Sequence, residues 1–138
     1  MKSIFVGGHF YSISQFTAGF IQSPNYPKPY PLNADCIWGL KAGINYTTTI
    51  RIYQFDVKPS ISNICIDFVR ISTYENSRTS NEAYYCGKTH PTYIYHQTRN
   101  IYIKFSSFIS LDLNGYTGFR IGYSLCKYDM MGSVFKNI

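Results

Sequence analysis

Apolar and polar side chains alternate along most of this chain in short runs, which is the pattern of β-strands that bury one face. In the longest run, residues 47–57, the predicted core face carries Thr48, Ile50 and Ile52. Further runs alternate in the same way at residues 36–40, 67–74, 100–105 and 118–125. No segment combines apolar residues at helical spacing with a capping signal, so we predict an all-β fold, either a sandwich or a barrel.

The segments between these runs are predicted to be loops, apart from a short edge strand near the N-terminus. Residues 19–31 include four prolines. Because proline fixes φ and lacks an amide hydrogen, this run is predicted to be a rigid, extended loop. Residues 75–81 are polar and are also predicted to be a loop, as are residues 106–117.

The composition is that of a single aromatic-rich domain with an excess of positive charge. The 138 residues include 18% aromatic side chains, which suits a sheet with large side chains on both faces. The net charge of +6 favours anionic partners such as sulfated glycans, acidic proteins, anionic lipids or nucleic acid. The basic residues are dispersed singly, which is also typical of an ordinary solvated surface. No apolar run is long enough for a membrane-spanning helix.

The cysteines indicate an oxidising compartment. None of Cys36, Cys65, Cys86 and Cys126 belongs to the closely spaced pair that a zinc site needs, so we expect two disulfides. Asn45 begins an N-glycosylation sequon, which agrees with secretion. We therefore expect a secreted, extracellular glycoprotein. The apolar segment in residues 1–6 is too short to be a secretory signal. If the protein is secreted, its signal is expected to have been removed, replaced or left out.

Seven motifs occur in an order that resembles the CUB domain family, over roughly residues 7–125. They are Gly19-Phe20-Ile21-x-Ser23-Pro24-Asn25-Tyr26-Pro27-x-x-Tyr30-Pro31, Cys36-x-Trp38, Ile50-x-Ile52-x-x-Phe55-Asp56-Val57, Cys65-Ile66-Asp67-Phe68-Val69-Arg70-Ile71, Tyr85-Cys86-Gly87, Asn100-Ile101-x-Ile103-x-Phe105-x-Ser107 and Gly118-Phe119-x-Ile121-x-Tyr123. The resemblance implies a jelly-roll-like sandwich of two antiparallel sheets. We expect an N-terminal segment with an edge strand at 1–18, a CUB-like core at 19–126 and a C-terminal tail at 127–138.

The cysteine pattern departs from the family that the chain resembles. CUB domains usually open with a cysteine that pairs with the one before the Trp, and here Val6 or a neighbour occupies that place. The resemblance implies that Cys65 pairs with Cys86, which is the family's second bridge. We predict a substitute bridge between Cys36 and Cys126, with an intermolecular bond through Cys126 as the alternative.

The calcium site of many CUB domains is predicted to be degenerate in this chain. The three acidic positions of that site fall on Lys58, Asp67 and Phe108. A calcium ion needs six to eight oxygen ligands, usually with several carboxylates, so we expect no metal. Our hypothesis is that Lys58 lies near Asp67 and takes over the charge of the ion. Calcium-dependent capture of a partner lysine would then not transfer to this chain.

The predicted function is a non-catalytic extracellular binding module that recognises proteins or anionic glycans through loops and a basic sheet face. We expect neither enzymatic activity nor a cofactor, since no nucleophile, metalloprotease or phosphate-binding motif occurs. Outward pairs of basic and aromatic residues would also suit nucleic acid, but the predicted extracellular location favours sulfated or acidic glycans or acidic proteins. The best-placed basic residues are Arg51, Lys58, Arg70, Lys104 and Arg120.

Two questions about context stay open at this point. The domain resembles both the stand-alone subgroup of the family, the spermadhesins, and a module cut from a larger extracellular protein. The alternative function is a structural subunit of an extracellular matrix, coat or filament, which would assemble through exposed Tyr and Phe side chains or through Cys126.

Overall fold

A computed structural model of the chain describes residues 10–12, 18–41, 46–75, 78–96, 100–109 and 115–127. These residues form strands and connecting loops, and no helix that could cross a membrane occurs among them. The strands are β1 (Phe10–Ser12), β2 (Ala18–Gln22), β3 (Asp35–Lys41), β4 (Tyr46–Asp56), β5 (Phe68–Glu75), β6 (Arg78–Tyr85), β7 (Tyr93–His96), β8 (Asn100–Ser106) and β9 (Gly118–Lys127).

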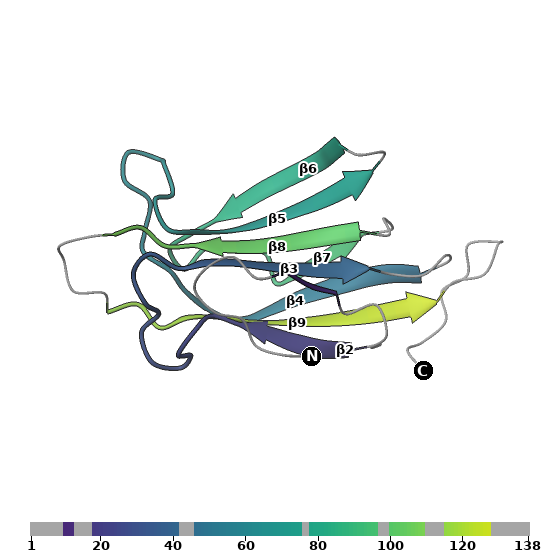
Figure 1. Cartoon of the computed structure of the whole chain (residues 1–138), viewed down its shortest axis with the longest axis horizontal. Coiled ribbons are helices and arrows are strands. Elements are labelled where there is room, and N and C mark those ends of the chain that lie inside the picture. The colour runs from purple at the N-terminus through teal and green to yellow at the C-terminus, as the bar shows by residue number, and fades with distance from the viewer. Residues whose placement is uncertain are drawn as a thin grey trace.

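The strands form two stacked sheets (Figure 1). One sheet has the order β1-β3-β8-β5-β6 and the other has the order β2-β9-β4-β7. Neighbouring strands are antiparallel, except that the short edge strand β1 runs parallel to β3. The predicted sandwich of two antiparallel sheets is therefore confirmed, with β1 as a parallel addition at one edge.

The core lies between the two sheets and is built by the predicted alternation. Along β8, every second residue is buried, and Ile101, Ile103 and Phe105 are fully covered. The two sheets meet through edge-to-face aromatic contacts, in which the ring centroids of Trp38 and Phe105 lie 6.0 and 5.2 Å from that of Phe119. Such contacts add to the free energy gained by burying the rings, and they fix how one sheet lies on the other.

Three edge strands, β6, β7 and β2, were not predicted from the sequence, and residues 19–22 of β2 were expected to begin the Pro-rich loop. Residues 78–81 were expected to lie in a loop, but they begin β6, which pairs with β5 at the edge of the larger sheet. Strand β7 occupies the edge of the smaller sheet beside β4. The edge position explains the first error, because Asn81 and Glu82 face solvent and β6 therefore starts without the apolar alternation of a central strand.

A β-bulge interrupts the pairing of β4 with β9. Ile52 pairs with Ile121 and Gln54 pairs with Arg120, so Tyr53 is an extra residue on β4. Tyr53 and Gln54 are both exposed as a result, and the alternation resumes afterwards with a buried Phe55. A bulge redirects side chains in this way, and here it leaves Gln54 on the outer face of the sheet beside Tyr53.

One of the two expected disulfides is formed. Cys65 and Cys86 are joined with a Cα–Cα distance of 5.8 Å, which is the pairing that the resemblance implies. The predicted bridge between Cys36 and Cys126 is wrong, and both residues remain thiols. Cys126 lies seven residues beyond Phe119 on β9, or roughly 20 Å further along the sandwich, whereas Cys36 pairs with Phe105 at the level of Phe119. A disulfide needs Cα atoms within about 7 Å. An intermolecular bond through Cys126 stays a prediction.

Candidate binding sites

The Pro-rich segment between β2 and β3 lies at one end of the sandwich, which we call the loop end. Residues 19–22 of the predicted loop are part of β2, which corrects that prediction. The remaining residues, 23–31, are neither helix nor strand, but tight turns fold them back instead of leaving them extended: the Tyr26 N–H donates to Ser23 O and the Lys28 N–H donates to Asn25 O. Ser23 is buried and accepts a hydrogen bond from the Phe119 N–H through its hydroxyl, at 3.0 Å. The segment is thus tied to the first residues of β9.

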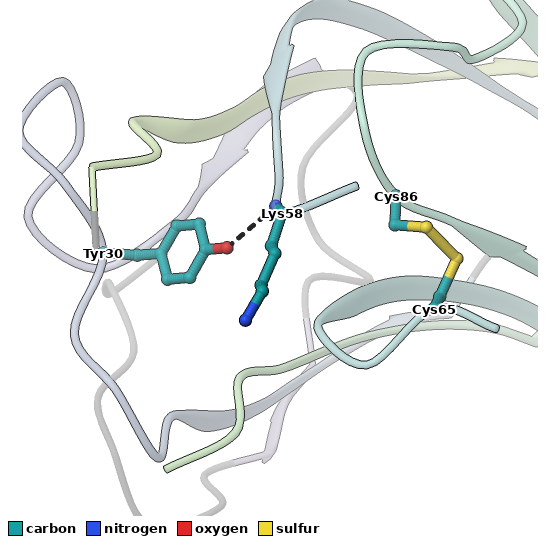
Figure 2. Close-up of a disulfide and its surroundings, with 4 residues drawn as sticks. All are labelled: Tyr30, Lys58, Cys65 and Cys86. Atoms are coloured by element: carbon teal, nitrogen blue, oxygen red, sulfur yellow. Dashed lines mark hydrogen bonds between the residues drawn. A yellow bond between two sulfur atoms is a disulfide. The ribbon is translucent and has the colours of Figure 1, made fainter. Parts of the chain in front are cut away.

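Tyr30 inserts into the loop end and connects the three positions of the degenerate calcium site. Its hydroxyl donates to Asp67 Oδ2 at 2.8 Å and accepts from the Lys58 backbone N–H at 3.1 Å (Figure 2). The Phe108 N–H donates to Asp67 Oδ1, also at 2.8 Å. Lys58, Asp67 and Phe108 therefore converge, but the link from Lys58 to Asp67 runs through the Tyr30 hydroxyl and not through a direct ion pair. Burial, followed by the neighbouring Asp67 carboxylate, raises the pKa of Tyr30 well above its ordinary value.

These residues do not fit a calcium ion. Asp67 is the one carboxylate among the three positions, and each of its oxygens already accepts a hydrogen bond from Tyr30 or Phe108. Lys58 would bring a positive charge to the same place. No cluster of three or more acidic, histidine or cysteine side chains suited to a metal occurs in the described ranges. A calcium ion needs several carboxylate oxygens, so we assign no metal to these three positions.

Apolar side chains are exposed on two loops at the loop end. The β4–β5 loop is held by the disulfide and turns tightly at Ser62 and Asn63, both with positive φ, and the Ile61 and Ile64 backbones are bonded to each other. The β8–β9 loop is held to the first loop by the Phe108–Asp67 hydrogen bond. The exposed fractions of these side chains range from 36 to 64%, and the residues are Ile61, Ile64, Ile66, Phe108 and Ile109.

The five predicted basic residues do not share one face. Arg70 and Lys104 lie on the outer face of the five-stranded sheet, where they pair with Glu82 at 3.7 Å and with Asp35 at 3.8 Å. Lys58 lies at the loop end. Arg51 and Arg120 lie on the outer face of the four-stranded sheet. The sequence did not show whether these five residues share one sheet, and the structure distributes them over both sheets and the loop end.

Arg51 and Arg120 belong to a continuous row of stacked side chains, which we call the Arg–aromatic ladder. Arg51 lies 4.4 Å from the ring centroid of Tyr53 and 5.3 Å from that of Tyr93. The rings of Tyr53 and Phe20 lie 5.6 Å apart, and Arg120 lies 4.1 Å from the centroid of Phe20. Sequence reasoning missed Phe20 and Tyr93, because they come from β2 and β7 at opposite edges of the sheet.

The predicted glycosylation site, Asn45, lies outside the described residues, and glycosylation stays a prediction. The neighbouring Thr47 of the sequon is in β4, where its hydroxyl donates to the Cys126 carbonyl oxygen at 3.3 Å.

A family model for the CUB domain matches residues 12–123. The chain belongs to the CUB domain family. Curated relatives include rat (Rattus norvegicus) cubilin, 28% identical over 77% of this chain and 3% of the relative, and Xenopus laevis bone morphogenetic protein 1, 32% identical over 71% of this chain and 14% of the relative. The chain thus spans only a small part of these curated relatives.

A solved CUB structure has the same fold. The second CUB domain of MASP-1, in a crystal structure bound to Ca²⁺, superimposes with a TM-score of 0.69 at 26% identity, covering 86% of this chain and 98% of that one. CUB domains are non-catalytic modules that occur in extracellular proteins and generally mediate binding between proteins. Where relatives are metalloproteinases, the catalytic activity lies in other domains.

Proposed function

We propose that this CUB domain is a secreted binding module that holds a protein partner at the loop end, without a bridging calcium ion. The observation that carries the proposal is the set of exposed apolar side chains on the β4–β5 and β8–β9 loops, led by Phe108 at 64% and Ile64 at 62% exposure. Apolar side chains gathered at one place on a surface are typical of protein interaction sites. Residues 19–126 would form the binding domain, with 1–18 and 127–138 as flanking segments.

The charges at the loop end support a partner with acidic residues. Lys28 and Lys88 are exposed, and Lys88 follows Gly87, whose N–H donates to the Lys58 carbonyl oxygen at 3.3 Å. Among the described carboxylates beside these loops, Asp67 is buried and fully hydrogen-bonded, and Asp56 accepts hydrogen bonds from the Thr117 N–H and hydroxyl. The loop end therefore offers apolar contacts beside positive charge, which would attract a partner's Asp or Glu and repel a lysine.

A pair of matched double variants tests this proposal. Ile64→Ser/Phe108→Ser removes exposed apolar contacts at the loop end, and Tyr74→Ser/Tyr84→Ser removes exposed rings from the five-stranded sheet as the control. Extracellular proteins retained by the immobilised wild type are purified, and their affinities for all three forms are measured by calorimetry with and without a calcium chelator. We expect the loop-end variant to weaken binding at least about tenfold, with no effect of the control or of the chelator.

Two results would contradict the proposal: equal binding by the loop-end variant and the wild type, or binding that the chelator abolishes. Light scattering on the same proteins addresses the alternative role as a structural subunit. Concentration-dependent assembly of the wild type that the loop-end variant abolishes would show that the partner is a second copy of the chain.

A further inference from the structure

The outer face of the four-stranded sheet carries a second surface, at a different place from the loop end. We infer that the Arg–aromatic ladder, formed by Tyr93, Arg51, Tyr53, Phe20 and Arg120, is a binding site for a sulfated glycan chain. The site goes beyond the proposed protein-binding role, because it lies on another part of the fold and takes another class of ligand.

The ladder forms a shallow trough across all four strands of the sheet. Its residues come from β7, β4, β2 and β9, so the row extends about 14 Å at the usual spacing between strands. A depression of about 280 Å³ lies along the part of the ladder from Tyr93 to Phe20, and Thr49 and Ser124 add hydroxyl groups to its lining. Arg120 is not part of this lining and packs on the Phe20 ring beside it. The length and the open form suit several units of an extended chain better than a compact small molecule.

Gly122 keeps the floor of this depression low. In the sheet, Gly122 of β9 lies opposite Arg51 of β4 on one side and opposite Phe20 of β2 on the other. A Cβ atom at this position would meet the Tyr53 ring at 2.7 Å and the Phe20 ring at 3.4 Å. The two rings therefore approach each other over Gly122, and this approach continues the stack from one arginine to the other.

The charge on this face is not neutralised within the sheet. Asp56 is the only acidic residue in the four strands, and its Oδ2 accepts hydrogen bonds from the Thr117 N–H and hydroxyl, at 3.0 and 3.2 Å. Arg51 and Arg120 pack on rings, and in the described part of the chain neither forms an ion pair. The cations of the other sheet, Arg70 and Lys104, each have a carboxylate partner.

Stacking prepares the two guanidinium groups to bind sulfate. A planar guanidinium that lies on a ring keeps its N–H groups in one plane, from which it binds two oxygens of an anion at once. Packing on a ring also restricts the side chain before the ligand arrives, which lowers the entropy lost on binding. Sulfate groups repeated along a sugar chain would meet the arginines, and the apolar C–H faces of the sugars would pack on the edges of the rings.

A glycan fits this face better than an acidic protein does. The exposed side chains of the ladder are aromatic or cationic, whereas the exposed isoleucines and Phe108 gather at the loop end. Aromatic rings with charged and hydroxyl groups suit a hydrated, hydroxyl-rich ligand. The described lining of the depression has only one aliphatic side chain, the small Ala18, and no leucine, isoleucine or valine of the kind that a protein partner would use.

The test compares two double variants with the same change in charge. Arg51→Ser/Arg120→Ser removes both cations of the ladder, and Arg70→Ser/Lys104→Ser removes two cations from the other sheet. Binding of a heparin-derived octasaccharide is measured by calorimetry at physiological salt, alongside the chemically desulfated octasaccharide and a poly-glutamate peptide. Circular dichroism and thermal unfolding show that each variant folds.

We expect the ladder variant to bind the sulfated octasaccharide about tenfold or more weakly, since the loss of one charge-assisted hydrogen bond suffices for that change. The control variant should bind within about threefold of the wild type, and Arg51→Lys/Arg120→Lys should recover only part of the affinity, because an ammonium lacks the planar stacked form. A Phe20→Leu variant, which keeps both charges but loses a ring, should also bind more weakly.

Three outcomes would overturn the inference. Equal weakening by both serine variants would show that net charge alone attracts the glycan. A failure of the wild type to bind at physiological salt would remove the site. Binding of poly-glutamate as tight as that of the octasaccharide, and equally sensitive to the ladder variant, would assign the face to an acidic protein instead.

Discussion

Replacing Tyr30 by Phe removes only one hydroxyl group, but it should destabilise the domain more than so small a change suggests. The ring is fully buried and packs edge-to-face on Phe105 at 4.9 Å, and a phenylalanine would keep these contacts. What is lost is the hydroxyl, which donates to the buried Asp67 carboxylate and accepts from the Lys58 N–H. A hydrogen bond to a charged group contributes about 1.5–3 kcal/mol. We expect Tyr30→Phe to lower the free energy of unfolding by about 2–3 kcal/mol.

The measurement is equilibrium unfolding in urea, followed by the fluorescence of the single tryptophan, Trp38, which is buried between the sheets. Tyr84→Phe is the matched control. Tyr84 is half exposed in β6 and packs on Phe68 at 5.1 Å, so removing its hydroxyl should change the free energy of unfolding by less than about 0.5 kcal/mol.

A double-mutant cycle with Asp67→Asn isolates the interaction between Tyr30 and Asp67. If the two side chains act through their hydrogen bond, their effects will not add, and the coupling free energy should be about 1 kcal/mol or more. Additive effects, or a Tyr30→Phe variant as stable as Tyr84→Phe, would refute the reasoning that this hydroxyl holds the loop end together.

Three further predictions concern the backbone, the buried thiol and calcium. Gly118 has φ of +91° and a Cβ there would collide with the Ser23 hydroxyl, so Gly118→Ala should cost about 2 kcal/mol or more in urea unfolding, whereas Gly115→Ala, with open space around it, should be nearly neutral. Burial raises the pKa of Cys36 from 9.0 to about 11, so the stability from its protonated thiol is complete below pH 9 and falls as the pH rises from 9 to 11. Between neutral and alkaline pH, the free energy of unfolding should fall less steeply in Cys36→Ala than in the wild type. An identical fall in both proteins would contradict this assignment. Millimolar calcium or a chelator should leave the thermal midpoint unchanged, and a rise with calcium would show that a metal site exists.

Much of the fold was predictable because alternation reports which face of a strand is buried. The predicted inward residues of the central strands are buried, and Ile50, Val69 and Ile121 are fully covered. Strands β6 and β7 escaped prediction because edge strands are covered on fewer sides and need less apolar sequence. The pairing of strands comes from contacts distant in the sequence, so alternation alone does not show that β1 would join β3 in parallel.

The binding sites were less predictable than the fold for the same reason. The sequence indicated that Arg51, Arg70, Lys104 and Arg120 point outward, but not which sheet each strand would join. The sequence also did not show where each residue would lie along the length of the sandwich. The Cys36–Cys126 bridge was expected from the number of cysteines, whereas β9 carries Cys126 to the end of the sheet opposite the loop end. Tyr30 was recognised as part of a motif, but its hydrogen bonds depend on Lys58 and Asp67, which are distant in the sequence.

Hydrogen bonds between segments distant in the sequence hold the loop end in place. Ser107 takes part in three hydrogen bonds there: its hydroxyl donates to Pro31 O at 2.7 Å and accepts from the Ala34 N–H at 2.8 Å, and its own N–H donates to Ala34 O at 3.0 Å. Together with the bonds of Tyr30 and Ser23, these contacts join the Pro-rich segment to β8, β9 and the β4–β5 loop. All of these hydrogen bonds join groups of the protein itself, so they do not depend on the concentration of an ion. The described residues around Ile64 and Phe108 are therefore held in place before a partner arrives, and their affinity for it should stay constant where the extracellular calcium concentration changes.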